Sequence, residues 1–216
     1  MKENMKISVS FLSSYDKAKD LRKLNVTDVD YIHVDYMDGR FVPYKSLSFR
    51  QLKTIYKYTS KRLDVHLMTR NPEKLIRQFA TLNTEFITLH VEIKKDISKL
   101  IDLIHSYGIK AGLSIKPDTP IALLEPYLEK IDLILVMSVE PGRGGQEFLE
   151  NTPSRVLAIK NLLKTYEKSD ILLSIDGGIN NITKEGVQDL VDIMVSGSYI
   201  TTGEDFQERI HNLRTH

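Results

Sequence analysis

The sequence predicts an α/β fold: a closed (β/α)8 barrel of the TIM type that forms a single domain over residues 1–216. Short apolar runs rich in β-branched residues alternate with stretches of helical periodicity, which is typical of a parallel sheet with helical crossovers. Eight such runs occur, one for each strand of a barrel. The 216 residues also match the length that barrels use for one domain, and no low-complexity segment or Gly/Ser linker divides them.

The runs that we expect to form strands are spaced by roughly one βα unit each, which fits a closed barrel better than an open sheet. They are Ile7–Ser10, Tyr31–Asp35, Arg62–Leu67, Phe86–His90, Lys110–Ser114, Leu133–Met137, Leu172–Ile175 and Ile193–Val195.

Two of the expected helices open on a polar residue followed by proline, a favoured start for a helix. Asn71 is expected to cap a helix that begins at Pro72, and Thr152-Pro153 opens the clearest helix of the chain. Their apolar stripes are Leu75, Ile76, Phe79 and Leu82 in the first, and Val156, Ile159, Leu162, Leu163 and Tyr166 in the second.

The remaining helix signals are shorter. A helix is expected over residues 98–107, with Tyr107 on its apolar face and Gly108 at the C-terminal position that favours glycine. Thr119-Pro120 begins another, which Pro126 should kink or divide. The last two helices are expected to begin at Thr183 and Glu204.

Composition points to a soluble cytoplasmic protein. The formal net charge is +1 with acids and bases interspersed, so there is no electrostatic reason to expect nucleic acid or a membrane surface. No cysteine is present, which excludes disulfides and thiolate chemistry. The apolar residues near the N-terminus are too few for a signal peptide, and the most apolar window, 131–139, is far too short to span a bilayer.

His33 and Asp35 lie two residues apart on the second expected strand, so their side chains point to the same face. An imidazole beside a carboxylate at the end of a strand can ligate a metal or move a proton. Taken alone, the pair fits equally well with two satisfied polar groups. The active sites of barrels lie at the carboxyl ends of the strands, so the other strands must supply partners.

Two further strands supply them. His66 on the third strand and Asp176 after the seventh complete a set of two nitrogen and two oxygen ligands, which suits Zn(II), Fe(II), Mn(II) or Co(II). Other candidates are expected to be structural, namely Asp64 and His90, or solvated, namely His105, His211 and His216.

Glycine-rich turns follow the last strands. Backbone N–H groups in such turns approach phosphates closely, and barrels frequently hold phosphate after strands seven and eight. Gly177-Gly178 and Gly197-Ser198 stand in those two loops. The sequence therefore predicts a small phosphorylated substrate.

Five segments of the chain resemble those of the ribulose-phosphate 3-epimerase family in their order and spacing: HVDYMDGRFVP, LDVHLMTRNPE, LVMSVEPGRGGQEF, SIDGGI and VSGS. The resemblance implies a divalent metal ion held by His33, Asp35, His66 and Asp176. It further implies Asp35 as the proton acceptor and Asp176 as the proton donor. Substrate contacts are implied for Ser10, His66, Gly142, Arg143, Gly144, Gly145, Gly177, Gly178, Gly197 and Ser198.

The chemistry implied by the resemblance is the inversion of a carbon next to a ketone. One carboxyl group removes the proton from one face and another returns a proton to the opposite face. A divalent metal stabilises the enediolate as a Lewis acid. The implied reaction is the conversion of D-ribulose 5-phosphate to D-xylulose 5-phosphate in the pentose phosphate pathway, and we expect a homo-oligomer.

The chain departs from the family pattern in three places. Arg143 stands where the family usually has Phe, Tyr44 where it usually has Asn, and residues 8–10 read Ser-Val-Ser where Ala-Pro-Ser is common. These changes keep open a related substrate such as D-allulose 6-phosphate. A barrel that binds a sugar phosphate without catalysis is disfavoured, because binding alone would not demand both Asp35 and Asp176.

Overall fold

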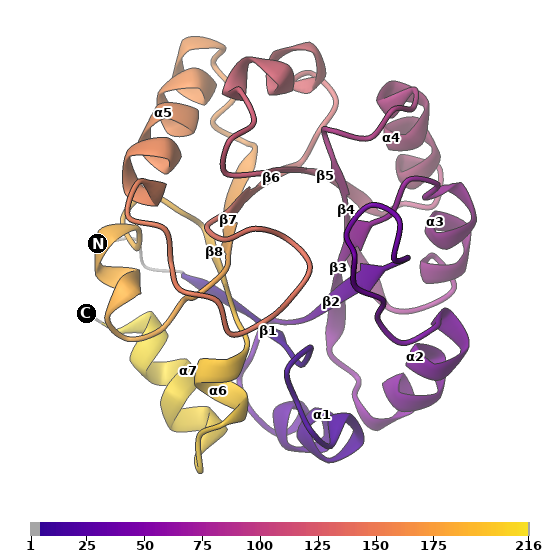
Figure 1. The fold of residues 1–216 in the computed structure, drawn as a ribbon, viewed down its shortest axis with the longest axis vertical. Helices are drawn as coiled ribbons and strands as arrows, with labels where there is room; N and C mark the ends of the chain where they lie inside the picture. The colour runs from indigo at the N-terminus through magenta and orange to yellow at the C-terminus, as the bar shows by residue number, and fades with distance from the viewer. Residues whose placement is uncertain (1–4, 216) are drawn as a thin grey trace.

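The computed structural model describes residues 5–215 and shows a closed barrel of eight parallel strands with helices around its outside (Figure 1). Each strand pairs with the next in the chain, and the last pairs with the first, which closes the sheet and confirms the predicted fold class. The strands are β1 Lys6–Ser10, β2 Tyr31–Met37, β3 Arg62–Met68, β4 Thr84–His90, β5 Lys110–Ile115, β6 Leu133–Met137, β7 Leu172–Asp176 and β8 Ile193–Ser196.

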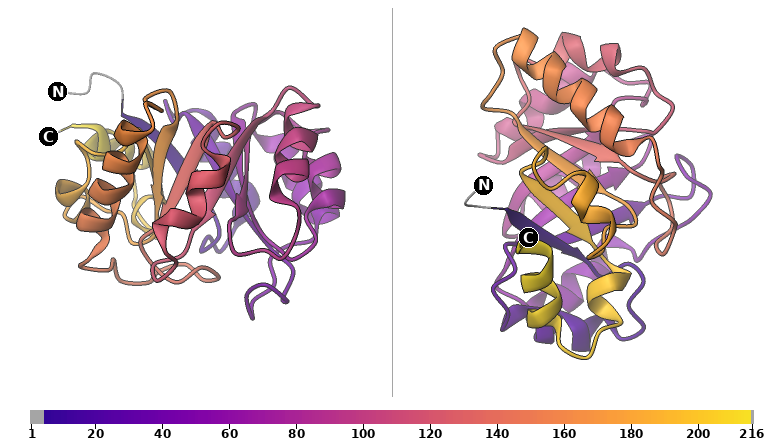
Figure 2. Two further views of the ribbon diagram at one scale, coloured as in Figure 1. Left: turned by 90° about the horizontal axis from the view of Figure 1, so that it is seen from above. Right: turned by 90° about the vertical axis from the view of Figure 1, so that its left-hand side faces the viewer.

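Helices and short 3-10 turns connect the strands and cover the barrel. They are α1 Lys17–Asn25, α2 Phe49–Ile55, η1 Tyr56–Tyr58, α3 Glu73–Phe79, α4 Ile97–His105, η2 Ile121–Tyr127, α5 Thr152–Thr165, η3 Thr183–Gly186, α6 Ser198–Thr201 and α7 Phe206–Arg214. In side view, the long loops that follow β2 and β6 project from the same end of the barrel (Figure 2). The loop after β6 also crosses the barrel mouth (Figure 1).

Strand β2 shows how the alternation of side chains builds both layers of the core. Ile32 and Val34 belong to the large apolar cluster that the strands form with the surrounding helices. Tyr31 belongs to a second cluster with Phe86, Leu133 and Ile193. His33 and Asp35 continue the face of Tyr31, so the strand carries an apolar side chain at one end of the barrel interior and polar ones toward the other.

Three predicted helix starts were wrong by one or two residues, including that of α4, which was expected over residues 98–107 and spans Ile97–His105. Helix α3 begins at Glu73, because the carbonyl of Pro72 accepts the first helical hydrogen bond from Ile76 N at 2.8 Å, so Asn71 lies too early to cap it. Helix α7 begins at Phe206 rather than Glu204. The side chain of Asp205 caps it by accepting a hydrogen bond from Glu208 N at 3.0 Å.

Other helical expectations hold only in part. The segments after Thr119-Pro120 and from Thr183 form 3-10 turns rather than α-helices, and η2 contains Pro126, which has no N–H to donate. Two tyrosines expected on buried helix faces, Tyr107 and Tyr166, are each 43% exposed. Leu82 lies beyond the end of α3 but still packs on the core. Helices α1 and α2 and the short helix α6 were not predicted individually.

Within residues 5–215, no helix combines the length and the apolar character required to cross a bilayer.

Candidate metal and substrate site

Four side chains from β2, β3 and β7 converge inside the carboxyl end of the barrel. They are His33, Asp35, His66 and Asp176, and one potential ligand atom from each lies within 4.8 Å of all the others. Asp35 Oδ1 lies 3.4 Å from both His33 Nε2 and His66 Nδ1. Asp176 Oδ2 lies 3.7 Å from His33 Nε2 and 3.9 Å from His66 Nδ1. The structure thus brings together the four residues that the sequence predicts as metal ligands.

Strand register explains the convergence. In the pairing of β2 with β3, His33 lies opposite Asp64 and Asp35 lies opposite His66. Two inward-facing levels therefore each hold one imidazole and one carboxyl group. The level nearer the carboxyl ends of the strands holds Asp35 and His66, and the level below it holds His33 with Asp64 as its support.

Asp64 is structural, as expected. It is buried, and its Oδ2 accepts hydrogen bonds from His33 Nδ1 at 2.8 Å and from Ser8 Oγ at 2.8 Å. Because a carboxylate accepts, the neutral His33 ring carries its proton on Nδ1, so Nε2 is the nitrogen that can offer a lone pair to the site.

A longer chain of contacts orients His66. Its Nε2 lies 2.9 Å from His90 Nε2, and His90 Nδ1 lies 3.0 Å from Glu92 Oε2. With His90 neutral, His90 Nδ1 donates to the Glu92 carboxylate, so His90 Nε2 must accept from His66 Nε2. His66 Nδ1 is then left with a lone pair that faces the site.

The electrostatic setting of this chain supports that assignment. Burial lowers the pKa of His90 to about 4, so its ring is neutral. Burial works against ionisation of Glu92, but hydrogen bonds from His90, Thr119 and the backbone of Lys116 outweigh it and lower the pKa of Glu92 to about 2. Glu92 therefore accepts at both oxygens, including from Lys116 N at 2.8 Å and Thr119 Oγ1 at 2.6 Å.

The donor set fits a divalent cation. Among the described residues, His33 Nε2 and His66 Nδ1 are buried polar atoms without a hydrogen-bond partner, and both face the two aspartates. Buried polar atoms are normally satisfied, so a pair of orphaned nitrogens beside two carboxyl groups is what a metal site requires. Two imidazoles and two carboxylates suit zinc, iron, manganese or cobalt rather than calcium or magnesium.

The pKa values of the two aspartates are shifted in opposite directions. Burial raises the pKa of Asp176 to about 6, and the neighbouring charge of Asp35 adds to the rise. Burial would also raise the pKa of Asp35, but His33 and His66 outweigh it and hold that pKa well below the usual range. Burial would lower the pKa of His33, but Asp64 and Asp35 raise it well above 6.5. Two carboxyl groups in one site with divergent pKa values are a pattern of acid/base pairs.

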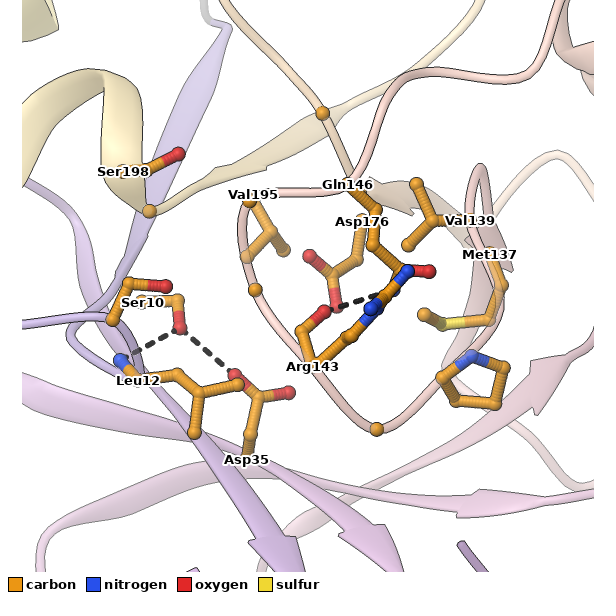
Figure 3. Close-up of a pocket in the computed structure, with 18 of the residues that line it drawn as sticks. Ser10, Leu12, Asp35, Met137, Val139, Arg143, Gln146, Asp176, Val195 and Ser198 are labelled. Atoms are coloured by element: carbon orange, nitrogen blue, oxygen red, sulfur yellow. Dashed lines mark hydrogen bonds between the residues drawn. The ribbon is translucent and has the colours of Figure 1, made fainter. Parts of the chain in front are cut away.

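A pocket at the carboxyl end of the barrel is lined by both Asp35 and Asp176 and opens directly over them (Figure 3). We call it the main pocket. Ser10 lines it and donates a hydrogen bond from its Oγ to Asp35 Oδ2 at 2.8 Å, and the backbone N–H of Leu12 donates to Ser10 Oγ at 3.3 Å. Ser10 thereby holds one oxygen of Asp35 while the other faces the imidazoles. His33 and His66 are fully buried beneath the pocket and do not line it, so a direct contact of His66 with substrate stays a prediction.

The loop after β6 forms one wall of the pocket. The predicted residues of this loop that line the pocket are Gly142, Arg143, Gly144 and Gly145. Gly142 and Gly145 have φ angles of 127° and 71°, which favour glycine. A Cβ at Gly142 would lie 3.1 Å from Cδ2 of Tyr44, so Tyr44 packs against this loop rather than lining the pocket.

The glycine turns after β7 and β8 form another part of the pocket wall. Gly177, Gly178, Gly197 and Ser198 all line it, as predicted. Gly177 and Gly178 have φ angles of 124° and 66°. A Cβ at Gly178 would lie 2.7 Å from Phe148 N and 3.0 Å from Gln146 O, so the turn packs tightly against the end of the β6 loop.

Glu92 and Gln146 were not among the site residues that the sequence predicts. Glu92 was not singled out, although it stands two residues after His90, the same spacing that separates His33 from Asp35. Gln146 was also missed. Its Nε2 donates to Glu140 O at 2.7 Å and Arg143 O at 2.9 Å, which ties the β6 loop together.

Comparisons with known proteins identify relatives along nearly the whole chain. The sequence model of the ribulose-phosphate 3 epimerase family matches residues 6–201. A ribulose-phosphate 3-epimerase of Helicobacter pylori (strain J99) is 37% identical over 213 residues, covering 97% of both chains. That of Bacillus subtilis (strain 168) is 32% identical over 209 residues, covering 96% of this chain and 95% of the relative.

Solved structures with low sequence identity share the fold. A tryptophan synthase chain of Mycobacterium tuberculosis superimposes with a TM-score of 0.70 at 14% identity, covering 99% of this chain and 93% of the other. The 3-hexulose-6-phosphate synthase of Salmonella typhimurium gives a TM-score of 0.66 at 16% identity, with 97% of each chain covered. At these identities the likeness shows the barrel fold alone.

Proposed function

The chain belongs to the ribulose-phosphate 3-epimerase family of enzymes, and from that premise we propose that it interconverts D-ribulose 5-phosphate and D-xylulose 5-phosphate. The observation that carries the proposal is the pair Asp35 and Asp176, which reach one pocket from β2 and β7 above two imidazoles with inward-facing lone pairs. Inversion at C3 requires two proton-transfer groups, one for each face of the substrate.

In this proposal Asp35 and Asp176 exchange roles with the direction of the reaction. Asp35 takes the proton from C3 of D-ribulose 5-phosphate, next to the C2 ketone, and Asp176 gives a proton to the opposite face. The pKa values support this assignment of base and acid, because the pKa of Asp35 is low and that of Asp176 is raised to about 6. Proton exchange with solvent, or the reverse reaction, restores the starting state.

His33, Asp35, His66 and Asp176 would hold one divalent cation, which we propose to be zinc, iron, manganese or cobalt. When bound, such an ion supplies Lewis-acid stabilisation of the negative charge that develops on the substrate oxygens. The residues themselves position the two carboxyl groups: Ser10 holds Asp35, and the contacts of Asp64 and Glu92 hold the two imidazoles.

The far end of the substrate would bind at the glycine turns. Gly177, Gly178, Gly197 and Ser198 present backbone to the pocket without bulky side chains, an arrangement that suits a phosphate group. Binding the phosphate there fixes which carbon lies between Asp35 and Asp176. This orientation uses binding energy remote from the reacting carbon.

A six-carbon ketose phosphate such as D-allulose 6-phosphate is the second candidate. The observation that favours it is the packing of Tyr44 on Gly142, which shapes the loop over the pocket. Steady-state kinetics on both sugars separate the two, and we expect the larger kcat/KM with D-ribulose 5-phosphate. A larger kcat/KM with the six-carbon sugar would reverse the assignment. If neither sugar is turned over, the remaining candidate is a barrel that binds a sugar phosphate without catalysis.

A further inference from the structure

The main pocket contains a single positive charge. Among the described residues that line it, Asp35, Glu140 and Asp176 are acidic and Arg143 alone is cationic. A phosphate ester carries about −1.5 to −2 charges at pH 7. The cation proposed above would offset Asp35 and Asp176 at the reacting end of the ligand, so at the phosphate end only backbone amides and Arg143 could offset the charge of the phosphate.

The side chain of Arg143 is free to contribute. It is exposed on the β6 loop, and its guanidinium makes no hydrogen bond or ion pair with any residue in the range 5–215. Its backbone carbonyl alone is engaged, as the acceptor of a hydrogen bond from Gln146 Nε2. An arginine held at a pocket wall by its backbone, with five unused N–H donors, is suited to bind an anion.

Two cations of the neighbouring cavities, Lys17 and Arg209, are already engaged, and a third, Lys45, lines the adjoining cavity but not the main pocket. Lys17 lines an adjoining cavity, and its ammonium donates to the carbonyl oxygens of Phe11, Leu12 and Ser14 at 3.3, 2.9 and 2.8 Å. Arg209 lines a third cavity. Its guanidinium donates to Tyr199 O at 3.1 Å and stacks on the same tyrosine ring at 4.6 Å.

The backbone that carries Arg143 lies beside the glycine turn. Gln146, whose side chain ties the loop at Glu140 and Arg143, has its carbonyl oxygen 3.0 Å from where a Cβ of Gly178 would be. The β6 loop and the turn after β7 are therefore adjacent walls of one pocket. A phosphate bound at Gly178 would therefore share this pocket with the Arg143 side chain.

We propose that the Arg143 guanidinium binds the phosphate group of the substrate and supplies the positive charge that the glycine turns lack. The inference deepens the proposed function, on which it rests for the identity of the ligand. A guanidinium matches phosphate with two parallel N–H···O bonds, so Arg143 selects a charged phosphate over a neutral hydroxyl at that end of the sugar. Arg143 thus determines substrate class without touching the reacting carbon.

The test compares Arg143→Gln with Arg70→Gln. Arg70 is exposed in the loop after β3, at the same end of the barrel, and does not line the pocket. Its substitution therefore removes the same charge from the same end of the molecule. Arg143→Lys keeps the charge but loses the planar fork, and it should recover part of the effect.

Two measurements are made on each variant: kcat and KM with D-ribulose 5-phosphate, and the competitive inhibition constant of inorganic phosphate, backed by direct phosphate binding followed by 31P NMR. For Arg143→Gln we expect KM and the inhibition constant to rise by about 10- to 100-fold, the size of effect expected when a charge-assisted contact with the phosphate is lost. The value of kcat should change little, because the interaction is the same in the ground and transition states.

Equal values of KM and of the phosphate inhibition constant in Arg143→Gln and Arg70→Gln would overturn the inference. A failure of the proposed function looks different. In that case the wild-type protein does not epimerise D-ribulose 5-phosphate, whereas weaker phosphate binding by Arg143→Gln in the 31P NMR titration still supports the role of Arg143.

Discussion

The two histidines of the site each present one ring nitrogen to the aspartates because the other nitrogen is already hydrogen-bonded. Asp64 holds His33, and the pair His90 and Glu92 holds His66. Contacts of this kind fix the tautomer and the ring orientation of metal-binding histidines. Metal affinity should therefore depend on residues that never touch the ion.

Glu92→Gln tests this dependence. An amide cannot accept hydrogen bonds at both of its ends, so the substitution breaks either the contact with His90 or the contacts with Lys116 N and Thr119. We expect the affinity for Zn(II), measured by competition with a chromogenic chelator, to fall about 10- to 100-fold. The control is Glu208→Gln, an exposed glutamate on α7. Equal affinities in the two variants would show that Glu92 has no role in orienting His66.

Asp176→Asn removes one of the two proton-transfer groups with little change of shape. We expect epimerisation, assayed with saturating metal, to fall by about 100- to 10,000-fold. The unfolding transition in urea should stay close to that of Asp189→Asn, an exposed control. Near-normal turnover with bound metal retained would contradict the two-carboxyl mechanism.

Single residues of the site differed in how well the sequence predicted them. His33, Asp35, His66 and Asp176 were predictable because strand alternation and strand ends determine where such side chains meet. The roles of Glu92 and Gln146 were not, since they follow from loop conformations that no periodic pattern encodes. The same holds for Tyr44, which contacts the β6 loop only in the folded chain.

At the level of elements, the bounds of the strands were predicted to within two residues, whereas the helices and their ends were predicted less accurately. A buried strand has an uninterrupted apolar run, as in β6, that marks both of its ends. A helix start depends on which carbonyl accepts the first hydrogen bond, and Asn71-Pro72 offers two choices. The 3-10 turns η2 and η3 replace α-helices because each connection is too short or too interrupted for a stable helix.

The turn after β7 provides a prediction at this scale. Gly178→Ala places a methyl group 2.7 Å from Phe148 N and 3.0 Å from Gln146 O at a φ of 66°, so backbone must shift. We expect the free energy of unfolding, measured in urea, to fall by about 2–4 kcal/mol, combining left-handed strain with the clash. Gly108→Ala is the matched control. It has a φ of 70° with nothing within 4 Å of the new Cβ, so we expect a loss of only about 1–2 kcal/mol. Equal losses would show that the turn relaxes without cost.

Over the whole molecule, the closed sheet is what brings the four candidate ligands together from distant parts of the chain. Residues 33 and 176 meet because β8 pairs with β1 and all eight strands point the same way. The fold class could be predicted from the count and spacing of the apolar runs. The electrostatics of the pocket could not, because they depend on which charged side chains remain unpaired after folding.

Chelation tests the metal requirement of the whole enzyme. Removal of bound metal should abolish epimerisation, and Zn(II), Fe(II), Mn(II) or Co(II) should restore it. Metal affinity should weaken as pH falls, because a histidine ligand must lose its proton to bind. The pKa of His33 is raised, so the weakening should begin above the ordinary histidine value of about 6.5. Full activity in a sample verified to be metal-free would contradict this account.

The most direct test of the central claim is to run the reaction in D2O and locate deuterium in the product. If Asp35 removes the C3 proton and Asp176 returns one from solvent to the opposite face, the first D-xylulose 5-phosphate formed carries one deuterium, at C3. Mass spectrometry and 1H NMR of the product at low conversion measure this. Product that forms at a normal rate with protium retained at C3 would contradict the mechanism.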